Sequence, residues 1–253
     1  MQLTHSNYFS PEAEAEYMSY SQFKAFESCE EAALLGEKAD KVCYTEGHFF
    51  EALLDGTAAE FLKDHPELLT QKGELRANYQ RVADAAHAIR RQPVLTDIID
   101  RCEKQVILVG EIAGVPFKGC VDLLDPETLD SYDTKNVKDF RRVWCDAEFS
   151  KMEWYFAYGY HYQAAIYREL IRQNFGRVGN QHLIAATKEV VPDVEFWIFS
   201  DEILNNAISI IEHCAPRYND IKQGREKACG CGYCDHCKTT RVIKEPYIIN
   251  EYK

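Results

Sequence analysis

The stretch GEIAGVPFKGCVDLLDPETLDSYDTKN, residues 110–136, places Asp122 in one apolar run and Asp133 at the end of the next. The residues around Asp122 are typical of a buried strand, Pro126 of a turn, and residues 131–135 of a returning strand. Adjacent antiparallel strands lie about 5 Å apart. We therefore expect the two carboxylates to lie side by side.

Lys135 follows Asp133 by two residues, so both side chains are expected on the same face of the strand. Paired carboxylates can share a hard divalent cation, which prefers oxygen ligands. A metal with a lysine beside it is suited to the hydrolysis of a phosphodiester. An Asp and an Asp-x-Lys near strand ends are also common in acidic proteins without any such chemistry, so these residues alone do not decide the function.

Further motifs accompany this pair in a fixed order. They are a Ser-rich helix start at residues 18–23, Gly-x-x-x-Glu at 47–51, Gly-x-x-Asp at 119–122, Asp-x-Lys at 133–135 and Gln-x-x-x-Tyr at 163–167. The set resembles the PD-(D/E)XK nuclease superfamily and, within it, the phage-type exodeoxyribonuclease VIII-like exonucleases, from about Met18 to Cys237. The departure is Glu51, because family members more often carry His at that position.

The resemblance implies an α/β (α+β-like) fold with a restriction-endonuclease-like core, in which helices flank a mixed central sheet. It implies that Glu51, Asp122, Asp133 and the backbone carbonyl of Thr134 hold Mg²⁺ or Mn²⁺, while Lys135 orients the attacking water. The implied reaction is exonucleolytic degradation of linear double-stranded DNA in phage-type recombination, which leaves a single strand for an annealing protein. Two alternatives stay open: a catalytically silent DNA-binding or assembly module, and a CRISPR-type or repair nuclease that acts on single strands.

Gln163 and Tyr167 lie four residues apart in a strongly helical stretch and therefore project from one face of the helix. An amphipathic core helix with a polar edge would look the same, whereas the resemblance implies that both residues line the active site and contact the nucleic-acid strand. We expect His161, which is off that face, to lie on the surface. Lys118 and Arg141 could bind phosphate, but we interpret both as solvated charges.

The second candidate site is the Gly-containing segment with Cys229, Cys231, Cys234 and Cys237. Ten cysteines in a chain that we expect to be cytosolic indicate metal binding more than disulfides. These four thiolates could hold a structural Zn²⁺, since C-x-x-C spacing is typical of such sites. Related nucleases instead carry one cysteine before the nuclease motifs and three after them, which hold a [4Fe–4S] cluster; Cys29 would then be the first ligand and Cys229 would be spare. We favour the cluster slightly.

Composition limits the remaining function classes. The 253 residues are 46% hydrophobic, and the net charge of −12 argues against a sequence-independent DNA coat, which depends on many Lys and Arg. No apolar run approaches the ~20 residues of a membrane span, and residues 1–16 are polar and acidic, unlike a signal segment. We therefore expect a cytoplasmic protein without a membrane partner; a homo-oligomer is left open.

The expected organisation has three parts. Residues 1–103 form an N-terminal helical region with the first active-site helix, 104–225 the nuclease core, and 226–253 a Cys-rich metal-binding tail that packs on the core. Helices are predicted at 19–36, 47–54, 58–64, 74–91, 152–174 and 200–223, and strands at 105–112, 117–124, 131–135, 183–191 and 195–199.

Overall fold

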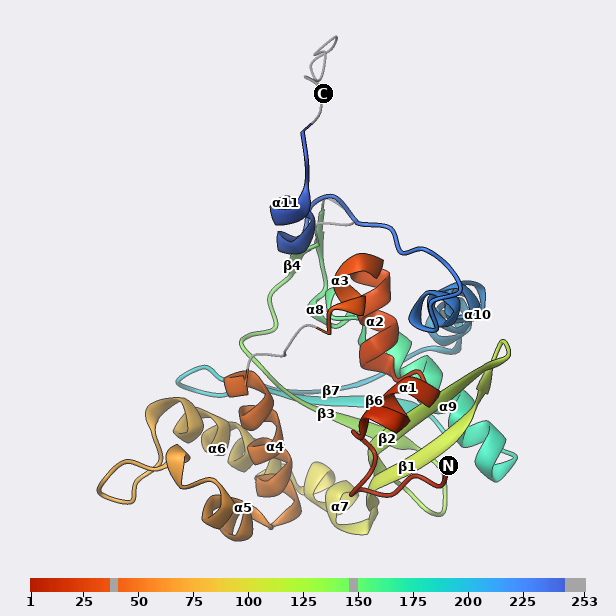
Figure 1. Cartoon of the computed structure of the whole chain (residues 1–253). Coiled ribbons are helices and arrows are strands. Elements are labelled where there is room, and N and C mark those ends of the chain that lie inside the picture. Colours follow the sequence, from red (N-terminus) through yellow and green to blue (C-terminus); the bar gives the residue numbers. More distant parts are fainter. Residues whose placement is uncertain (37–40, 146–149, 244–253) are drawn as a thin grey trace.

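The structure, a computed structural model, describes residues 1–36, 41–145 and 150–243. Its centre is a five-stranded sheet in the order β1-β2-β3-β6-β7 (Figure 1). The strands are β1 (Glu103–Ile112), β2 (Val115–Leu124), β3 (Ser131–Val137), β6 (Gln181–Thr187) and β7 (Val194–Ile198). β3 and β6 run parallel, and the other neighbouring pairs run antiparallel. The predicted mixed sheet flanked by helices is confirmed.

Helices cover both faces of this sheet (Figure 1). One face carries α4 (Lys41–Asp55), α5 (Ala58–Asp64), η1 (Pro66–Leu68), α6 (Ala77–Arg90) and α7 (Pro93–Arg101). The other face carries α2 (Tyr20–Ser28), α8 (Trp154–Ala157), α9 (Tyr160–Phe175) and α10 (Asp201–Lys222). Along β6, Leu183 and Ala185 pack into the second layer, whereas Ile184 and Ala186 pack into the first. A strand buried on both faces reads as a continuous apolar run, which is why the sequence marks it clearly.

The parallel pairing of β3 with β6 requires a long crossover connection. The chain between these strands supplies it with α8 and α9 and with a separate two-stranded ribbon of β4 (Val143–Cys145) and β5 (Ser150–Met152). α9 packs across β1 and β2. It thereby brings the predicted Gln163 and Tyr167 to the strand that carries Asp122.

Two predicted helices are each divided. The helix expected at 19–36 begins with the predicted capping box of Ser19 and Gln22, but it stops at Cys29, which adopts an extended conformation with φ −169° and ψ 114° between α2 and α3 (Glu30–Leu34). The helix expected at 152–174 is interrupted by Gly159, whose φ of 76° is a left-handed conformation that favours glycine. In the first case the break serves the cysteine cluster described below.

Two further segments, the N-terminal arm and the described part of the Cys-rich tail, pack around these layers. The N-terminal arm, residues 1–17 with α1 (Pro11–Glu16), leads to Met18, which exchanges backbone hydrogen bonds with Pro116 and Lys118 of β2. At the other end, the Cys-rich tail contains α11 (Asp235–Thr240), where a loop was expected, and it lies above α3 (Figure 1). Within the described ranges, no helix combines the length and the apolar character that crossing a membrane requires.

Candidate active site and four-cysteine cluster

The first feature of the site is the point where β2 and β3 separate. These strands pair only at Leu123 with Tyr132 and at Leu124 with Ser131. Beyond that point Asp122 Oδ2 accepts hydrogen bonds from Thr134 N at 2.9 Å and from Thr134 Oγ1 at 3.3 Å. The carboxylate thus takes the place of a backbone acceptor, which fixes Asp122 where the two strands diverge.

Asp133 and Lys135 lie on the adjoining part of β3, on one face as predicted. Lys135 Nζ donates to Asp133 Oδ1 at 2.6 Å, and Gln163 Nε2 donates to the same oxygen at 2.8 Å. The second oxygen, Asp133 Oδ2, is buried and has no hydrogen-bond partner among the described residues. A buried carboxylate oxygen without a donor is costly unless an ion or water satisfies it. This oxygen is therefore suited to a cation.

Gln163 and Tyr167 form a polar bridge from α9 to the sheet. Gln163 Nε2 also donates to Tyr167 Oη at 3.1 Å, and Tyr167 Oη donates to the backbone carbonyl of Cys120 at 2.8 Å. The bridge explains the glycine of the Gly-x-x-Asp motif, because a Cβ on Gly119 would lie 2.8 Å from Cε1 of the Tyr167 ring. Glycine lets the ring approach the strand, and the ring in turn holds the backbone two residues before Asp122.

α4 brings Glu51 to the same place. Glu51, Asp122 and Thr134 line a small cavity of about 10 Å³, which is space for roughly one water-sized particle. Burial, together with the charge of Asp122, raises the pKa of the Glu51 carboxyl to about 8, although Lys135 acts in the opposite direction. Glu51, which stands where the resemblance implies histidine, is thus close enough to Asp122 and Asp133 for their charges to act on its carboxyl group.

The charges of the site do not cancel. Burial raises the pKa of Asp133 to about 7; Lys135 opposes this effect and Asp122 adds to it. Burial lowers the pKa of Lys135, but the charges of Asp133 and Asp122 outweigh it and raise that pKa above its ordinary value. If all three carboxyl groups were ionised, they would outnumber the one fixed cation, and for this reason the site favours protons on Glu51 and Asp133. A divalent cation with oxygen ligands would balance the charge of the ionised carboxylates instead.

Three further residues of the site were missed from the sequence. Asp55 lines the small cavity one helical turn after Glu51, and its i, i+4 spacing was an available signal. Gln105 of β1 also lines it, and its φ of 52° is unusual for a non-glycine residue and a form of strain that gathers at functional sites. Lys135 Nζ lies 5.1 Å from the centroid of the Tyr160 ring. Neither Gln105 nor Tyr160 had a local sequence signal, because each joins the site only through tertiary packing.

Two predictions about nearby residues are wrong. Lys118, interpreted as a solvated charge, is fully buried and forms an ion pair with Glu14. His161, expected on the surface, is half-buried between the rings of Phe156 and Tyr162, and burial lowers its pKa to about 4. Arg141 is exposed. Lys118 is covered by the N-terminal residues Tyr8 and Glu14, which carry no periodic pattern from which its burial could be predicted.

Four cysteines form a second group. The thiol sulfurs of Cys29, Cys231, Cys234 and Cys237 all lie within 4.8 Å of one another. The Sγ atoms of Cys29 and Cys237 are 3.6 Å apart, and those of Cys231 and Cys237 are 3.9 Å apart. Four sulfurs bonded to a tetrahedral Zn²⁺ at ≈ 2.3 Å would be about 3.8 Å apart. The donor set and its spacing therefore fit zinc, whereas the thiolates of a [4Fe–4S] cluster bind four separate iron atoms and need wider spacing.

Cys229 lies outside this four-cysteine cluster. It is exposed, and its backbone N donates to Glu30 Oε2 at 2.7 Å. Arg217 of α10 donates to both carboxylate oxygens of Glu30, each at 2.8 Å. The extended Cys29, the tail and α10 are thus tied together at one place. Burial opposes ionisation of Cys231, but backbone N–H groups of the tail donate to its sulfur and lower its pKa to about 7, which favours the thiolate that a metal needs.

Comparison with known proteins agrees with this geometry. The model of a family described as PDDEXK-like domains of unknown function (DUF3799) matches residues 19–240. The crystal structure of a protein from Eubacterium rectale, provisionally named an exonuclease, is 31% identical, covers 98% of this chain and 97% of its own, and has a TM-score of 0.86. The structure of SSO0001 is 13% identical over 74% of this chain and 81% of its own, with a TM-score of 0.32, which is too low to bear on the fold. No curated protein sequence is significantly similar.

The family match covers the sheet, the helices from α2 to α11 and both candidate sites, whereas α1 lies outside it. Asp122 lies on β2, and Asp133 and Lys135 lie on β3, where the two strands diverge. The chain belongs to the family of PDDEXK-like domains (DUF3799) and has the fold of the PD-(D/E)XK nucleases.

Proposed function

We propose that this protein is a divalent-metal-dependent exodeoxyribonuclease that hydrolyses phosphodiester bonds of linear double-stranded DNA. The observation that carries the proposal is the buried Asp133 Oδ2, which has no hydrogen-bond partner in the described part of the chain and is held beside Asp122, Glu51 and Lys135. The exonuclease name of the 31% identical structure supports it. A purely structural carboxylate pair would be expected to satisfy all its oxygens from the protein.

The roles of the residues follow from their contacts. Asp122, Asp133, Glu51 and the backbone carbonyl of Thr134 would hold Mg²⁺ or Mn²⁺. Bound there, the metal stabilises charge on the phosphoryl group and supplies a water of lowered pKa. Lys135 stays charged and offers N–H donors to the attacking water or to the developing negative charge.

Gln163 and Tyr167 act mainly by positioning. Gln163 holds Asp133 Oδ1, which leaves Oδ2 free for a cation, and it shares its amide with Tyr167. The Tyr167 hydroxyl is used by Gln163 and by the Cys120 carbonyl. Tyr167 also lines a second, larger cavity, which Glu51 and Asp122 border as well. We infer that contact with the DNA strand, if it occurs at Tyr167, involves the ring and not the hydroxyl.

The four-cysteine cluster is proposed as a structural Zn²⁺ site formed by Cys29, Cys231, Cys234 and Cys237. The sulfur separations of 3.6 and 3.9 Å support zinc over the slightly favoured [4Fe–4S] cluster. Anaerobic purification followed by metal analysis and visible absorption distinguishes them: colourless protein with one zinc supports the proposal, and brown protein with iron contradicts it. Thiolate ligands of either kind accord with a reducing, cytoplasmic location.

The activity is tested with purified protein, Mg²⁺ or Mn²⁺, and three labelled substrates of equal length: linear duplex, closed circular duplex and linear single strand. We expect degradation of linear duplex from its ends and none of the circle. Asp133→Asn should abolish it, whereas Asp97→Asn, in an exposed i, i+4 ion pair of α7, should not. Binding without cleavage would support the silent module instead, and cleavage of single strands alone would support the repair-type alternative.

A further inference from the structure

A cavity of about 580 Å³ opens beside the candidate metal site. Glu51 and Asp122 form part of its wall, and the N-terminal arm supplies another part with His5, Tyr8 and Phe9. The volume lies within the ~300–1,000 Å³ of pockets that bury a small ligand. It is too small for a duplex, whose major groove alone is about 12 Å wide, so only unpaired nucleotides could enter.

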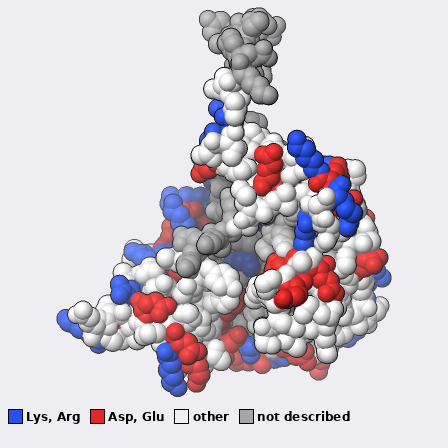
Figure 2. Space-filling view, in the orientation of Figure 1, with Lys and Arg blue, Asp and Glu red and all other residues white. Residues whose placement is uncertain are grey.

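Aromatic side chains are frequent in the wall of this cavity, whereas Lys and Arg side chains are scarce. Phe9 is 63% exposed, and its ring packs edge-on against Tyr8 with centroids 4.9 Å apart. Within the described ranges, Lys118 is the single Lys or Arg among the residues that line the cavity, and Glu14 and the Tyr8 carbonyl occupy its ammonium group. The face in Figure 2 likewise shows Lys and Arg scattered among Asp and Glu, without a continuous basic band. A nucleic-acid strand would therefore be bound here by stacking of its bases more than by neutralisation of its phosphates.

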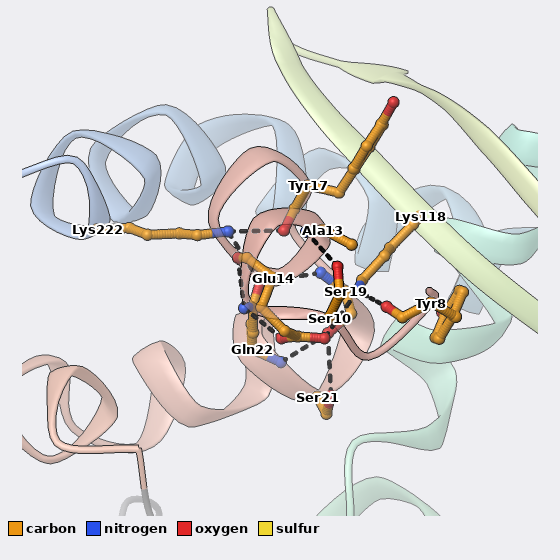
Figure 3. Close-up of polar contacts among 10 residues, drawn as sticks. All are labelled: Tyr8, Ser10, Ala13, Glu14, Tyr17, Ser19, Ser21, Gln22, Lys118 and Lys222. Atoms are coloured by element: carbon orange, nitrogen blue, oxygen red, sulfur yellow. Dashed lines mark hydrogen bonds and ion pairs between the residues drawn. The ribbon is translucent and has the colours of Figure 1, made fainter. Parts of the chain in front are cut away.

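A residue of β2, the strand that carries Asp122, fixes the position of the N-terminal arm. Lys118 precedes Asp122 by four residues on β2, so both side chains leave the same face. Its buried Nζ lies 2.7 Å from Glu14 Oε1 and 4.5 Å from the centroid of the Tyr8 ring, and it donates to the Tyr8 carbonyl (Figure 3). Because a buried charge that loses its partner is strongly destabilising, the arm is held against β2.

α2 and α10 reinforce this attachment (Figure 3). Gln22 of α2 donates to Glu14 Oε2 at 2.6 Å, and Lys222 of α10 donates to the Tyr17 carbonyl at 2.6 Å and to Gln22 Oε1 at 3.0 Å. The aromatic pair therefore faces the metal carboxylates across a cavity whose walls are fixed relative to one another.

We infer that the N-terminal arm is a binding element for unpaired nucleic acid, in which Phe9, supported by Tyr8, stacks on a base of the strand whose scissile phosphate lies at Asp122 and Asp133. Lys118 and Glu14 are its positioning residues. The inference rests on the proposed nuclease function and names the form in which the substrate enters the site. Stacking tolerates any base, so the arm would bind strands without sequence preference.

The test compares Phe9→Ala with Phe175→Ala, which removes a ring of similar exposure (47%) from the far end of α9, outside the cavity. Binding of a fluorescent 12-nucleotide oligodeoxythymidylate is measured by anisotropy in Ca²⁺, and again with a 12-nucleotide strand that is abasic throughout. Loss of one stacked base costs ≈ 1–3 kcal/mol, so Phe9→Ala should weaken binding of the first strand roughly 5- to 150-fold. Phe175→Ala should not change it.

On the abasic strand, wild type and Phe9→Ala should bind equally weakly, because there is no base to stack. Equal affinity of wild type and Phe9→Ala for the base-bearing strand overturns the inference, and so does an equal loss in Phe175→Ala. These outcomes are independent of catalysis. If Phe9→Ala binds normally while linear duplex is still degraded, the inference about the arm fails and the proposed nuclease function stands. If only Phe9→Ala loses affinity for the base-bearing strand but the wild type cleaves no substrate, the inference about the arm stands and the proposed nuclease function fails.

Discussion

Replacing Glu51 by glutamine should raise the unfolding free energy of the metal-free protein and lower that of the metal-bound protein. The substitution keeps the size and the hydrogen-bonding oxygen of the side chain but removes a charge that burial and Asp122 disfavour. A structural glutamate would show the opposite, because its loss would destabilise the metal-free fold. The sign of the change in the metal-free protein therefore separates a disfavoured buried carboxylate, as expected for a metal ligand, from a structural glutamate, and a surface carboxylate would show almost no change.

The size of the effect follows from the pKa. A group whose folded-state pKa is raised stabilises the fold below its unfolded value, and that stability is lost as the pH rises through the folded value. For Glu51 the window runs from 4.5 to about 8. At about 1.4 kcal/mol per pKa unit, the gain in unfolding free energy from Glu51→Gln has an upper bound of roughly 5 kcal/mol. Because the site can relax, we expect a gain of about 1–3 kcal/mol at pH 9 and almost none at pH 4.5.

The assay is urea denaturation in EDTA at pH 4.5, 7 and 9, repeated with a Mg²⁺ titration. Wild type should gain about 2.7 kcal/mol at a Mg²⁺ concentration 100 times its Kd. Glu51→Gln should need more Mg²⁺ for the same gain and for activity, and Glu51→His should recover part of it. Glu60→Gln, exposed on α5, is the control. A Glu51→Gln protein that matches wild type in EDTA at pH 9 and in its Mg²⁺ dependence would refute the reasoning.

Three other substitutions test separate parts of the structure. Lys135→Ala should lower kcat about 10²-fold or more, as the loss of a preorganised electrostatic group does, with Mg²⁺ stabilisation retained; a normal kcat in steady-state cleavage would contradict it. Gly119→Ala should force the Tyr167 ring away and cost about 1–3 kcal/mol of unfolding free energy, as overpacking does, and an unchanged urea midpoint would argue against the close approach. Cys234→Ser should lose the tail metal and much stability, because metal binding contributes folding free energy; Cys229→Ser should not, and equal thermal stability of both would exclude a structural metal there.

The central strands could be predicted because the patterns that indicate them, alternation of side chains and turn residues, lie within a few neighbouring residues. Alternation along the strand places Asp133 and Lys135 on one face, and a short turn after Asp122 returns the chain beside it. The structure adds what the sequence could not contain: the carboxylate of Asp122 replaces a ladder acceptor for Thr134, which parts the strands. Glu51 had no local signal, and only the order of the family motifs identified it.

The N-terminal residues show why the remainder was not predictable. The segment after Cys29, EEAALL, continues the helical pattern of α2, so only the contact with cysteines about 200 residues later explains the break. Lys118 has the sequence environment of any charged residue near a strand end. Its burial depends on an arm of short, irregular structure whose placement the sequence does not encode by period.

The two candidate metal sites differ in the number of free donor positions. In the four-cysteine cluster, four thiolates complete a tetrahedral set and join residue 29 to residues 231–237, so a metal there would hold the chain ends and have no position left for a substrate. At the carboxylate site, Asp133 Oδ2 has no hydrogen-bond partner among the residues that the structure describes, Lys135 supplies one fixed positive charge, and a cavity of about 580 Å³ lies alongside. Only the second arrangement leaves room for both a cation and a phosphate. We therefore expect hydrolysis to take place at the carboxylate site on the sheet, and we expect the four-cysteine cluster to stabilise the attachment of residues 231–237 to residue 29.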